Sequence, residues 1–464
     1  MMSRSCRYYA ALLLLLGMSC AWAAGAPDPR TTVLPIYQLP ASAAVDGKLG
    51  EWAHVPVSDD QLIYCAEKNA ALVAPSENIA VSLRCGRVAG KPDLYFLIVV
   101  KDSILLSREA HYWVEPDYLE LYFDLFREKR TAEDPEWRLR KFFKPPAMGQ
   151  FGLRPLCMNA TPTLVANNVA RPWKLDYACV PIEGGVAYEI RLDGQSVLAN
   201  LKDDLHAADL PPVIGFDIGV GDLDSPVILR AATWNNLEIF YRFFGDFLNH
   251  DTPVHYGGLS TKPLPVPRGK AVPIKTLEQL YGAKPTARQV VKCINTLPDA
   301  QLADLVRWAV IQGVPLNADL LTPLFAAPMP RAQEAALLAL YYHREQADAV
   351  RLAVRQTYAR HDRATPTALM LANLLNLEMH LNLRDALPAL LLHDDLRVFV
   401  STAQVLEQCG TAEDVKTMIA ARDTLLAKLA ACTDADSPAN KQRKAVYEEQ
   451  FAKSLAALRT RTAP

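Results

Sequence analysis

The chain has 464 residues, enough for two or three domains, and half of them are hydrophobic, so more than one core can be buried. Lysine and arginine (49) nearly balance aspartate and glutamate (51), which gives a formal net charge of −2. This balance provides no overall field that would recruit nucleic acid or an anionic membrane, so a nucleic-acid-binding protein is not expected.

The first 24 residues have the pattern of a signal peptide. Arg4 and Arg7 precede an apolar run, and the small residues of "AWAAG" offer a cleavage site near Ala24. The run is short for a bilayer span, and no later stretch reaches about 18 apolar residues, so we expect no transmembrane segment in the mature chain. The pattern predicts an exported protein, periplasmic, outer-surface or extracellular. A lipoprotein anchored through Cys20 is the alternative.

Export would place the cysteines in an oxidising compartment, where disulfides persist. The spacing of the four cysteines in the first half suggests two local bridges, Cys65–Cys85 and Cys157–Cys179. Four cysteines allow three pairings, so the sequence leaves this connectivity open. The chain has no Cys-x-x-Cys pair and no histidine-rich cluster, which makes metal binding by these cysteines the poorer interpretation.

Short runs with an apolar residue at every second position dominate the chain up to about residue 255, and this alternation is typical of strands. The clearest runs are residues 78–85, 93–102, 117–124, 185–194 and 213–224. The segment "GRVAGKPD" between the first two predicts a hairpin. Several short strands in succession predict an antiparallel β-sandwich, immunoglobulin-like or jelly-roll-like, over residues 33–252.

Residues 253–274 gather prolines and glycines without periodicity, and predict a semi-rigid linker. Beyond them the apolar residues recur at helical spacing, and Thr411 with Asp414 three residues later is typical of a capping box. Four segments look repetitive, which predicts an α-helical, HEAT-like and α-solenoid-like domain over residues 275–460. An irregular helical bundle is the alternative. The expected fold class is therefore multidomain, β followed by α.

Six pieces of sequence between about residues 45 and 248 resemble, in the same order, the family 9 carbohydrate-binding module, one of the DOMON-like β-sandwiches. They are "VDGKLGEWAHVP", "LYFLIVVKD", "WVEPDYLELYFD", "AYEIRL", "IGFDIGVGDLD" and the closing "TWNN" with "FGDFL". The resemblance implies a non-catalytic module that binds a glycan, at a chain end, with the helical domain as a spacer or as the site of a protein partner.

The resemblance also implies which residues hold the sugar. In this family two tryptophans clamp a terminal sugar and a strand glutamate hydrogen-bonds to it. The matching positions are Trp113, Trp234, Glu120, Asp117 and Asn235. Three residues separate Trp113 from Asp117, where the family has two. Each side chain also has a structural alternative: the tryptophans as core or edge-capping residues, and Glu120 as a solvated strand residue.

A structural calcium ion is frequent in this family. Calcium takes six to eight oxygen ligands, and aspartates in turns can supply them together with backbone carbonyls. The candidate ligands are Asp46, Asp102, Asp222 and Asp224. An aspartate in a turn commonly hydrogen-bonds its own backbone instead, so the sequence leaves both interpretations open.

No motif for catalysis is present: the chain has no Gly-x-Ser-x-Gly elbow, no His-Glu-x-x-His helix and no Walker loop. We therefore do not expect an enzyme. The main alternative to glycan binding is an envelope scaffold, in which the sandwich has lost sugar binding and the helical domain docks a protein partner. A haem-binding DOMON-like protein is a minor alternative.

Overall fold

The computed structural model describes residues 33–58, 79–102, 118–125, 148–155, 164–166, 173–205, 209–221, 257–315, 317–327, 329, 331–333, 335–336, 387–393 and 396–462. The strands are β1 (Val33–Leu39), β2 (Ile79–Val88), β3 (Leu94–Asp102), β4 (Tyr118–Asp124), β5 (Met148–Leu153), β6 (Leu164–Ala166), β7 (Leu175–Ile182), β8 (Gly185–Leu192), β9 (Val213–Gly221) and β10 (Gly257–Leu264). The helices are a 3-10 turn (Leu49–Trp52), α3 (Gly194–Leu205), α4 (Leu277–Tyr281), α5 (Ala287–Cys293), α6 (Asp299–Ile311), α7 (Ala318–Ala326), α11 (Leu387–Leu391), α12 (Leu396–Cys409), α13 (Ala412–Ala430) and α14 (Pro438–Thr462).

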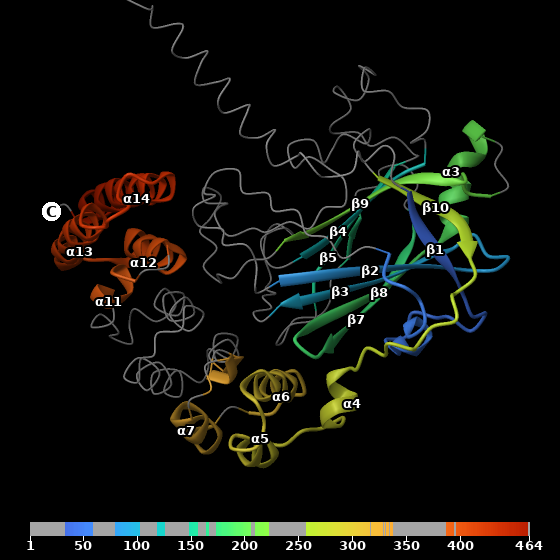
Figure 1. Ribbon diagram of the computed structural model, residues 1–464, viewed down its shortest axis with the longest axis horizontal. Helices are drawn as coiled ribbons and strands as arrows, with labels where there is room; N and C mark the ends of the chain where they lie inside the picture. Colours follow the sequence, from blue (N-terminus) through green and yellow to red (C-terminus); the bar gives the residue numbers. More distant parts are fainter. Residues whose placement is uncertain are drawn as a thin grey trace, which may run out of the picture.

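The described strands form one mixed sheet in the order β6-β5-β4-β9-β10-β1-β2-β3-β8-β7 (Figure 1). Most neighbours are antiparallel, but β1 runs parallel to both β10 and β2. The sheet curls, so that strands far apart in its order meet: Phe96 of β3 stacks on Phe216 of β9 with ring centroids 5.2 Å apart. The described strands thus form one curled, mixed sheet around a shared core, and the predicted antiparallel sandwich is not confirmed.

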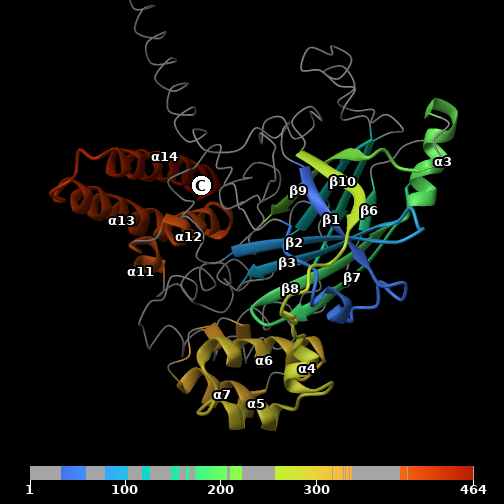
Figure 2. The same ribbon diagram turned by 45° about the vertical axis from the view of Figure 1, so that its right-hand side comes forward.

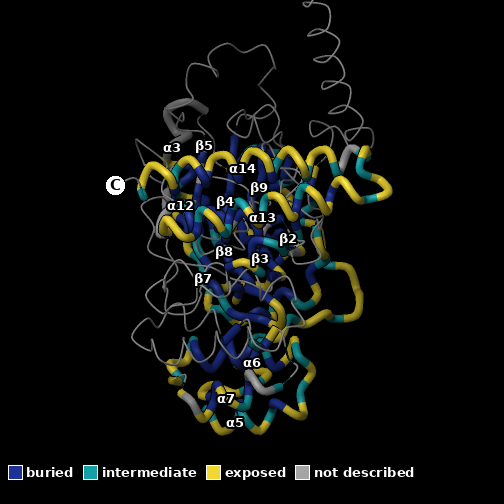
Figure 3. Tube along the Cα trace, turned by 90° about the vertical axis from the view of Figure 1, so that its left-hand side faces the viewer, coloured by how far each residue is buried: buried dark blue, intermediate teal, exposed yellow. Residues whose placement is uncertain are grey.

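Strand β3 is buried on both of its faces. Phe96 and Ile98 point into the core inside the curl, whereas Tyr95, Leu97 and Val99 belong to a second buried cluster on the outer face. Burial on both faces explains why "LYFLIVV" is a nearly continuous apolar run rather than a strict alternation. In Figure 3 the sheet accordingly forms the dark blue centre of the molecule.

Glu189 of β8 fastens the turn at residues 46–52 to the outer face of the sheet. Its Oε2 atom accepts hydrogen bonds from the backbone N–H groups of Asp46 (3.0 Å) and Gly47 (2.9 Å). Its Oε1 atom accepts one from the Trp52 indole N–H at 2.9 Å. Burial raises the pKa of Glu189, and the bonds from Trp52 and Gly47 act against that rise. This carboxylate therefore has a structural role.

The predicted linker is wrong for residues 257–264. They form β10, which pairs with β9 on one side and β1 on the other, and so lies inside the sheet. The glycine and proline content that suggested a linker suits a strand whose N-terminal half pairs with β9 and whose proline lies near its end. The irregular connection begins only after Leu264 and reaches Thr276, as the yellow segment in Figure 2 shows.

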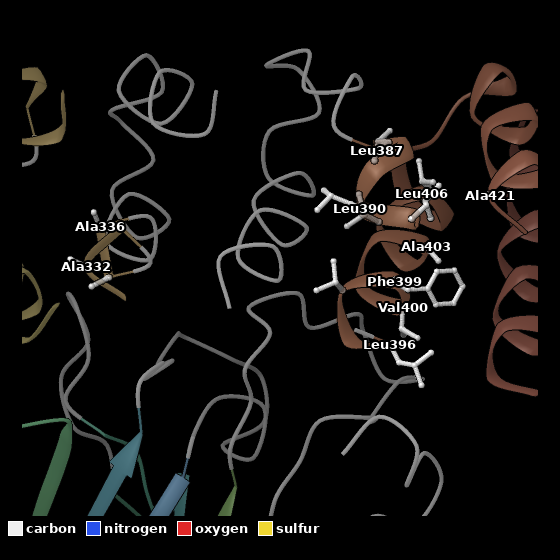
Figure 4. Close-up of a cluster of buried hydrophobic side chains, with 14 of the residues drawn as sticks. Ala332, Ala336, Leu387, Leu390, Leu396, Phe399, Val400, Ala403, Leu406 and Ala421 are labelled. Carbon is white, nitrogen blue, oxygen red and sulfur yellow. The ribbon is translucent and has the colours of Figure 1, made fainter. Parts of the chain in front are cut away.

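The described helices form two groups, α4–α7 near one end of the sheet and α11–α14 (Figure 1). In the second group, Phe399 of α12 packs against Tyr447 and Phe451 of α14, with ring centroids 4.8 and 4.9 Å apart. Figure 4 shows Phe399 among the buried aliphatic side chains of α12, with Leu387 and Leu390 of α11 in the same cluster. The prediction of a helical C-terminal region is confirmed. Most of the expected middle repeats fall in residues 337–386, outside the described residues, so the HEAT-like arrangement stays a prediction.

The capping box predicted at the start of α13 is present. The Asp414 carboxylate accepts hydrogen bonds from the backbone N–H of Thr411 at 2.6 Å and from its hydroxyl at 2.9 Å. Asp414 thereby satisfies a backbone donor that the helix itself leaves unpaired. Local sequence chemistry was sufficient to place this helix start.

Helix α6 is attached to the sheet through the turn between β7 and β8. Asp304 accepts hydrogen bonds from the backbone N–H of Gly184, and Arg307 donates to the carbonyl of Ile182 at 2.8 Å. Asp304 and Arg307 also form a buried ion pair at 2.8 Å. Burial raises the pKa of Asp304, while Arg307 acts against that rise. The first helices are therefore held on the sheet by specific, desolvated contacts.

Candidate functional site

The outward face of β4 carries the polar side chains that the sequence singled out. Leu119, Leu121 and Phe123 point into the core, and the alternate residues Glu120 and Tyr122 point the other way. This division confirms the predicted alternation. The polar face is nevertheless buried too, with Glu120 only 6% exposed and Tyr122 2% exposed. Glu120 is therefore not the solvated strand residue that the sequence left open.

The pairing of strands leaves Glu120 as the only side chain in its row across three strands. Its partner on β9 is Gly219 and its partner on β5 is Gly152. The carboxylate lies over Gly219, because a Cβ atom at that glycine would stand 3.3 Å from the Glu120 Oε2 atom. The same Cβ would stand 4.0 Å from the ring of Tyr122. Glycine on both sides thus makes room around one buried carboxylate.

The next row on this face pairs Tyr122 of β4 with Asp217 of β9. Asp217 is 1% exposed, and its Oδ1 atom accepts a hydrogen bond from the N–H of Ile218 at 2.9 Å. Glu120, Tyr122 and Asp217 all take part in further interactions within the chain, as buried polar groups must if their desolvation is to be offset. The face therefore brings together two carboxylates and a phenol, which together accept and donate hydrogen bonds.

Of the sugar-binding residues implied by the family resemblance, Glu120 is the one that the structure describes. Trp113, Asp117, Trp234 and Asn235 lie outside the described residues. The tryptophan clamp therefore stays a prediction, and the structure bears only on the strands from which it would be built.

The calcium ligands are likewise covered in part. Both oxygens of Asp46 are engaged with Lys48, its backbone N–H and its ammonium group each at 2.9 Å, and these bonds hold the pKa of Asp46 below its usual value. Asp102 is buried at the end of β3, and Asp222 and Asp224 lie outside the described residues. Within the described residues, no group of three or more His, Cys, Asp or Glu side chains is placed to hold a metal ion. Calcium stays a prediction.

Two of the four cysteines expected in disulfides are described. Cys85 of β2 and Cys179 of β7 are both buried in the core inside the curl. Their expected partners, Cys65 and Cys157, lie outside the described residues, so both bridges stay predictions.

Asp217 and the glycines beside Glu120 are not among the site residues predicted from the sequence. A usable signal was present in "IGFDIGVG", where Gly215, Gly219 and Gly221 alternate with the core residues Phe216 and Ile218. Repeated glycine on one face of a strand indicates that a neighbouring group approaches closely there. The identity of that neighbour requires the strand pairing, which the sequence does not give.

Comparisons with known proteins find no matching family model and no matching curated protein. Among solved structures the chain is similar to a family 9 carbohydrate-binding module from Caldicellulosiruptor kristjanssonii in complex with glucose, with 15% identity, a TM-score of 0.32, and coverage of 51% of this chain and 98% of that one. It is also similar to a protein from Bacteroides uniformis proposed to bind carbohydrate, with 10% identity, a TM-score of 0.28, and coverage of 49% and 98%. Likeness at this level does not assign a function.

Among the described residues, no helix is both long enough and apolar enough to cross a bilayer.

Proposed function

We propose that this chain is an exported, non-catalytic carbohydrate-binding protein whose glycan site is centred on Glu120. The observation that carries the proposal is the row Gly152–Glu120–Gly219, in which one carboxylate stands between two glycines beside the Tyr122–Asp217 row. The family resemblance of "WVEPDYLELYFD" and "IGFDIGVGDLD" concerns the same two strands, which are neighbours in the sheet.

The chemistry of this face suits a neutral ligand with many hydroxyl groups. Carboxylates accept hydrogen bonds from sugar hydroxyls, and a tyrosine hydroxyl both donates and accepts them. Stacking on the apolar side of the ring would come from Trp113 and Trp234, the residues implied by the resemblance. Binding at the end of a glycan chain is what the family resemblance implies for such a site.

A second candidate function, an envelope scaffold, is favoured by one observation. Glu120 and Asp217 already take part in interactions within the chain, so this face could be an internal polar layer that binds nothing. In that case the helical region, held on the sheet through Asp304 and Arg307, would act as the docking module for a protein partner.

A glycan array with the full-length mature protein separates these two functions. We expect the wild type to bind a neutral glycan, and Trp113→Ala, Trp234→Ala and Glu120→Gln each to lose about tenfold or more in affinity at an unchanged melting temperature. Glu278→Gln is the matched control, because Glu278 is exposed in the first turn of α4, and it should bind as the wild type does. If the wild type binds no glycan on a broad array, the scaffold function replaces the proposal.

A further inference from the structure

Basic residues are concentrated in one segment of a chain whose charges nearly balance overall. This segment, residues 262–292, is called the basic strap below. It contains seven basic residues, Lys262, Arg268, Lys270, Lys275, Lys284, Arg288 and Lys292, and a single acidic residue, Glu278. Its net charge is thus +6, whereas the whole chain has −2. The overall balance therefore conceals a strongly positive local surface.

All seven basic side chains of the strap are exposed. None of them takes part in an ion pair with another described residue, in contrast to Lys441, Lys444 and Lys453 of α14. Unneutralised cations along one segment create a positive potential that attracts an anionic partner and speeds its association. A merely solvated surface would more often mix both signs of charge.

The strap is held in place along its length. It begins in the last residues of β10, where Pro263 and Leu264 pair with β1. In its middle the N–H of Val272 donates to the carbonyl of Ala53 at 2.7 Å, and at Thr276 it enters α4 through a capping box. Figures 1 and 2 both show it running along the outside of the molecule from β10 to α4. The backbone that carries these cations is therefore held in place, which reduces the entropy lost on binding.

The exposed apolar residues of the strap help to choose between anionic partners. Leu264, Val272 and Leu280 are exposed, at 50%, 61% and 37%, but the strap has no tryptophan or phenylalanine. Its single aromatic residue, Tyr281, is half-buried and donates its hydroxyl to the Gln301 carbonyl. Membrane interfaces are usually anchored by aromatic side chains, and single-stranded nucleic acids by aromatic stacking on the bases. Neither partner fits this segment well.

We propose that the basic strap binds an acidic polysaccharide, with the carboxylate groups of the polymer lying along the row of lysines and arginines. A polyanion complements a segment that exposes seven cations and carries one acidic residue, and sugar rings can lie on exposed aliphatic side chains such as Val272. The strap shares no residue with the Glu120 site, so this site is independent of the proposed function: either can fail while the other holds.

The test measures binding of the full-length mature protein to polygalacturonate and to its methyl ester, which keeps the sugar backbone and lacks the charge. We expect binding to polygalacturonate alone, weakening steeply as salt is raised from about 50 to 200 mM because counterions are released on binding. Lys270→Glu/Lys275→Glu should reduce affinity by about tenfold or more at low salt. The control is Lys416→Glu/Arg459→Glu, two exposed cations of α13 and α14, which should change affinity less than about twofold.

Four results would overturn the proposal. They are absence of polygalacturonate binding by the wild type, equal binding to the methyl ester, equal loss in the control variant, and equally tight, strap-dependent binding to vesicles rich in anionic lipid or to single-stranded DNA. Neutral-glycan binding by Lys270→Glu/Lys275→Glu is measured in parallel. It should match the wild type, because the Glu120 site is built from other strands.

Discussion

Asp304 on α6 accepts hydrogen bonds from the backbone N–H of Gly184, in the turn between β7 and β8, at 3.2 and 3.0 Å to its two oxygens. The residues are 120 positions apart in sequence. Arg307, one helical turn later, pairs with Asp304 and bonds the carbonyl of Ile182. The sheet and α6 therefore share a buried polar contact, and they should unfold as a coupled unit.

Replacing Asp304 with alanine tests this coupling. The variant leaves the buried Arg307 without its carboxylate and the Gly184 N–H without an acceptor. Removing one partner of a buried ion pair typically costs about 3–5 kcal/mol, because the remaining charge is uncompensated. We expect a loss of this order in the free energy of unfolding, and faster hydrogen exchange at the β7–β8 turn. Both are measurable by denaturant titration and amide exchange.

The control for this prediction is Asp319→Ala, an exposed aspartate in the first turn of α7, which should change stability by less than about 1 kcal/mol. A double variant, Asp304→Leu/Arg307→Met, should regain part of the loss, because it removes the uncompensated charge but still leaves the Gly184 N–H and the Ile182 carbonyl without these partners. Equal behaviour of Asp304→Ala and Asp319→Ala would contradict the coupling.

The features that the sequence predicted well are those set by neighbouring residues. The hairpin between β2 and β3 follows from alternating apolar residues on either side of a glycine-containing turn. The capping box at Thr411 follows from two side chains three residues apart. In both cases the interacting groups are close in sequence, so no knowledge of the rest of the fold was needed.

The features that the sequence did not predict depend on contacts between distant segments. The parallel pairing of β1 with β10 and β2 joins residues from three parts of the chain, and it links the described strands into one sheet. Glu189 illustrates the same limit at the level of a side chain. It lies on an alternating strand as a surface glutamate would, but the turn at Asp46 to Trp52 buries it.

The candidate site has one feature that the sequence predicted and one that it did not. The side of the strand on which Glu120 lies follows from the alternation of polar and apolar residues. Its burial does not follow from that alternation, because the pattern distinguishes a polar face from an apolar one but does not show which segments cover the polar face. The role of Gly219 as the neighbour of Glu120 becomes apparent only from the register of β4 against β9. A single sequence fixes neither the register nor the covering of a strand.

Glu189 provides a prediction about pH. Burial raises its pKa in the folded state above the ordinary value of 4.5, so the folded protein binds this proton more tightly than the unfolded chain does. Its contribution to stability is therefore complete below about pH 4.5, and it decreases as the pH rises through the higher folded-state pKa. Glu189→Gln has no titrating group here and should lack this dependence.

Glu189→Gln should also be less stable than the wild type by about 1–3 kcal/mol, since one amide oxygen cannot accept the bonds from Trp52, Asp46 and Gly47 together. The gap between the two proteins should be larger at pH 4.5 than at pH 7.5. Urea titrations of both proteins at the two pH values measure it, with Glu278→Gln as the exposed control. A gap that grows toward neutral pH would contradict the pKa shift of Glu189.

Arg461 near the end of α14 should stabilise the C-terminus of α12. Its guanidinium donates hydrogen bonds to the carbonyls of Glu407 (2.6 Å), Leu406 (2.9 Å) and Gly410 (2.6 Å). These carbonyls lie at the C-terminal end of α12, which carries the negative end of the helix dipole, so a cation there is favourable. We expect Arg461→Ala to lower the free energy of unfolding by about 1–2 kcal/mol in a denaturant titration.

Arg459→Ala is the matched control for Arg461, because Arg459 is an exposed arginine of the same helix turn. It should change stability by less than about 0.5 kcal/mol. Arg461→Lys should recover part of the loss, since an ammonium group keeps the charge but cannot reach three carbonyls with one planar fork. A loss of the same size in both alanine variants would show that the contacts of Arg461 contribute nothing specific.

Gly219 tests whether the position of the Glu120 carboxylate matters for glycan binding. An alanine methyl group would stand 3.3 Å from the Glu120 Oε2 atom and would displace that carboxylate by a few tenths of an ångström. The fold should tolerate this, with a change in unfolding free energy below about 1 kcal/mol, because the atom displaced ends a flexible side chain. Glycan affinity should fall about tenfold if Glu120 hydrogen-bonds the sugar, since about 1.4 kcal/mol corresponds to that factor.

Gly50→Ala is the control, because a Cβ atom there meets nothing within 4 Å. If Gly219→Ala binds glycan as tightly as Gly50→Ala does, with Trp113→Ala still inactive, the sugar is held by the tryptophans and Glu120 belongs to the structural polar layer of the sheet.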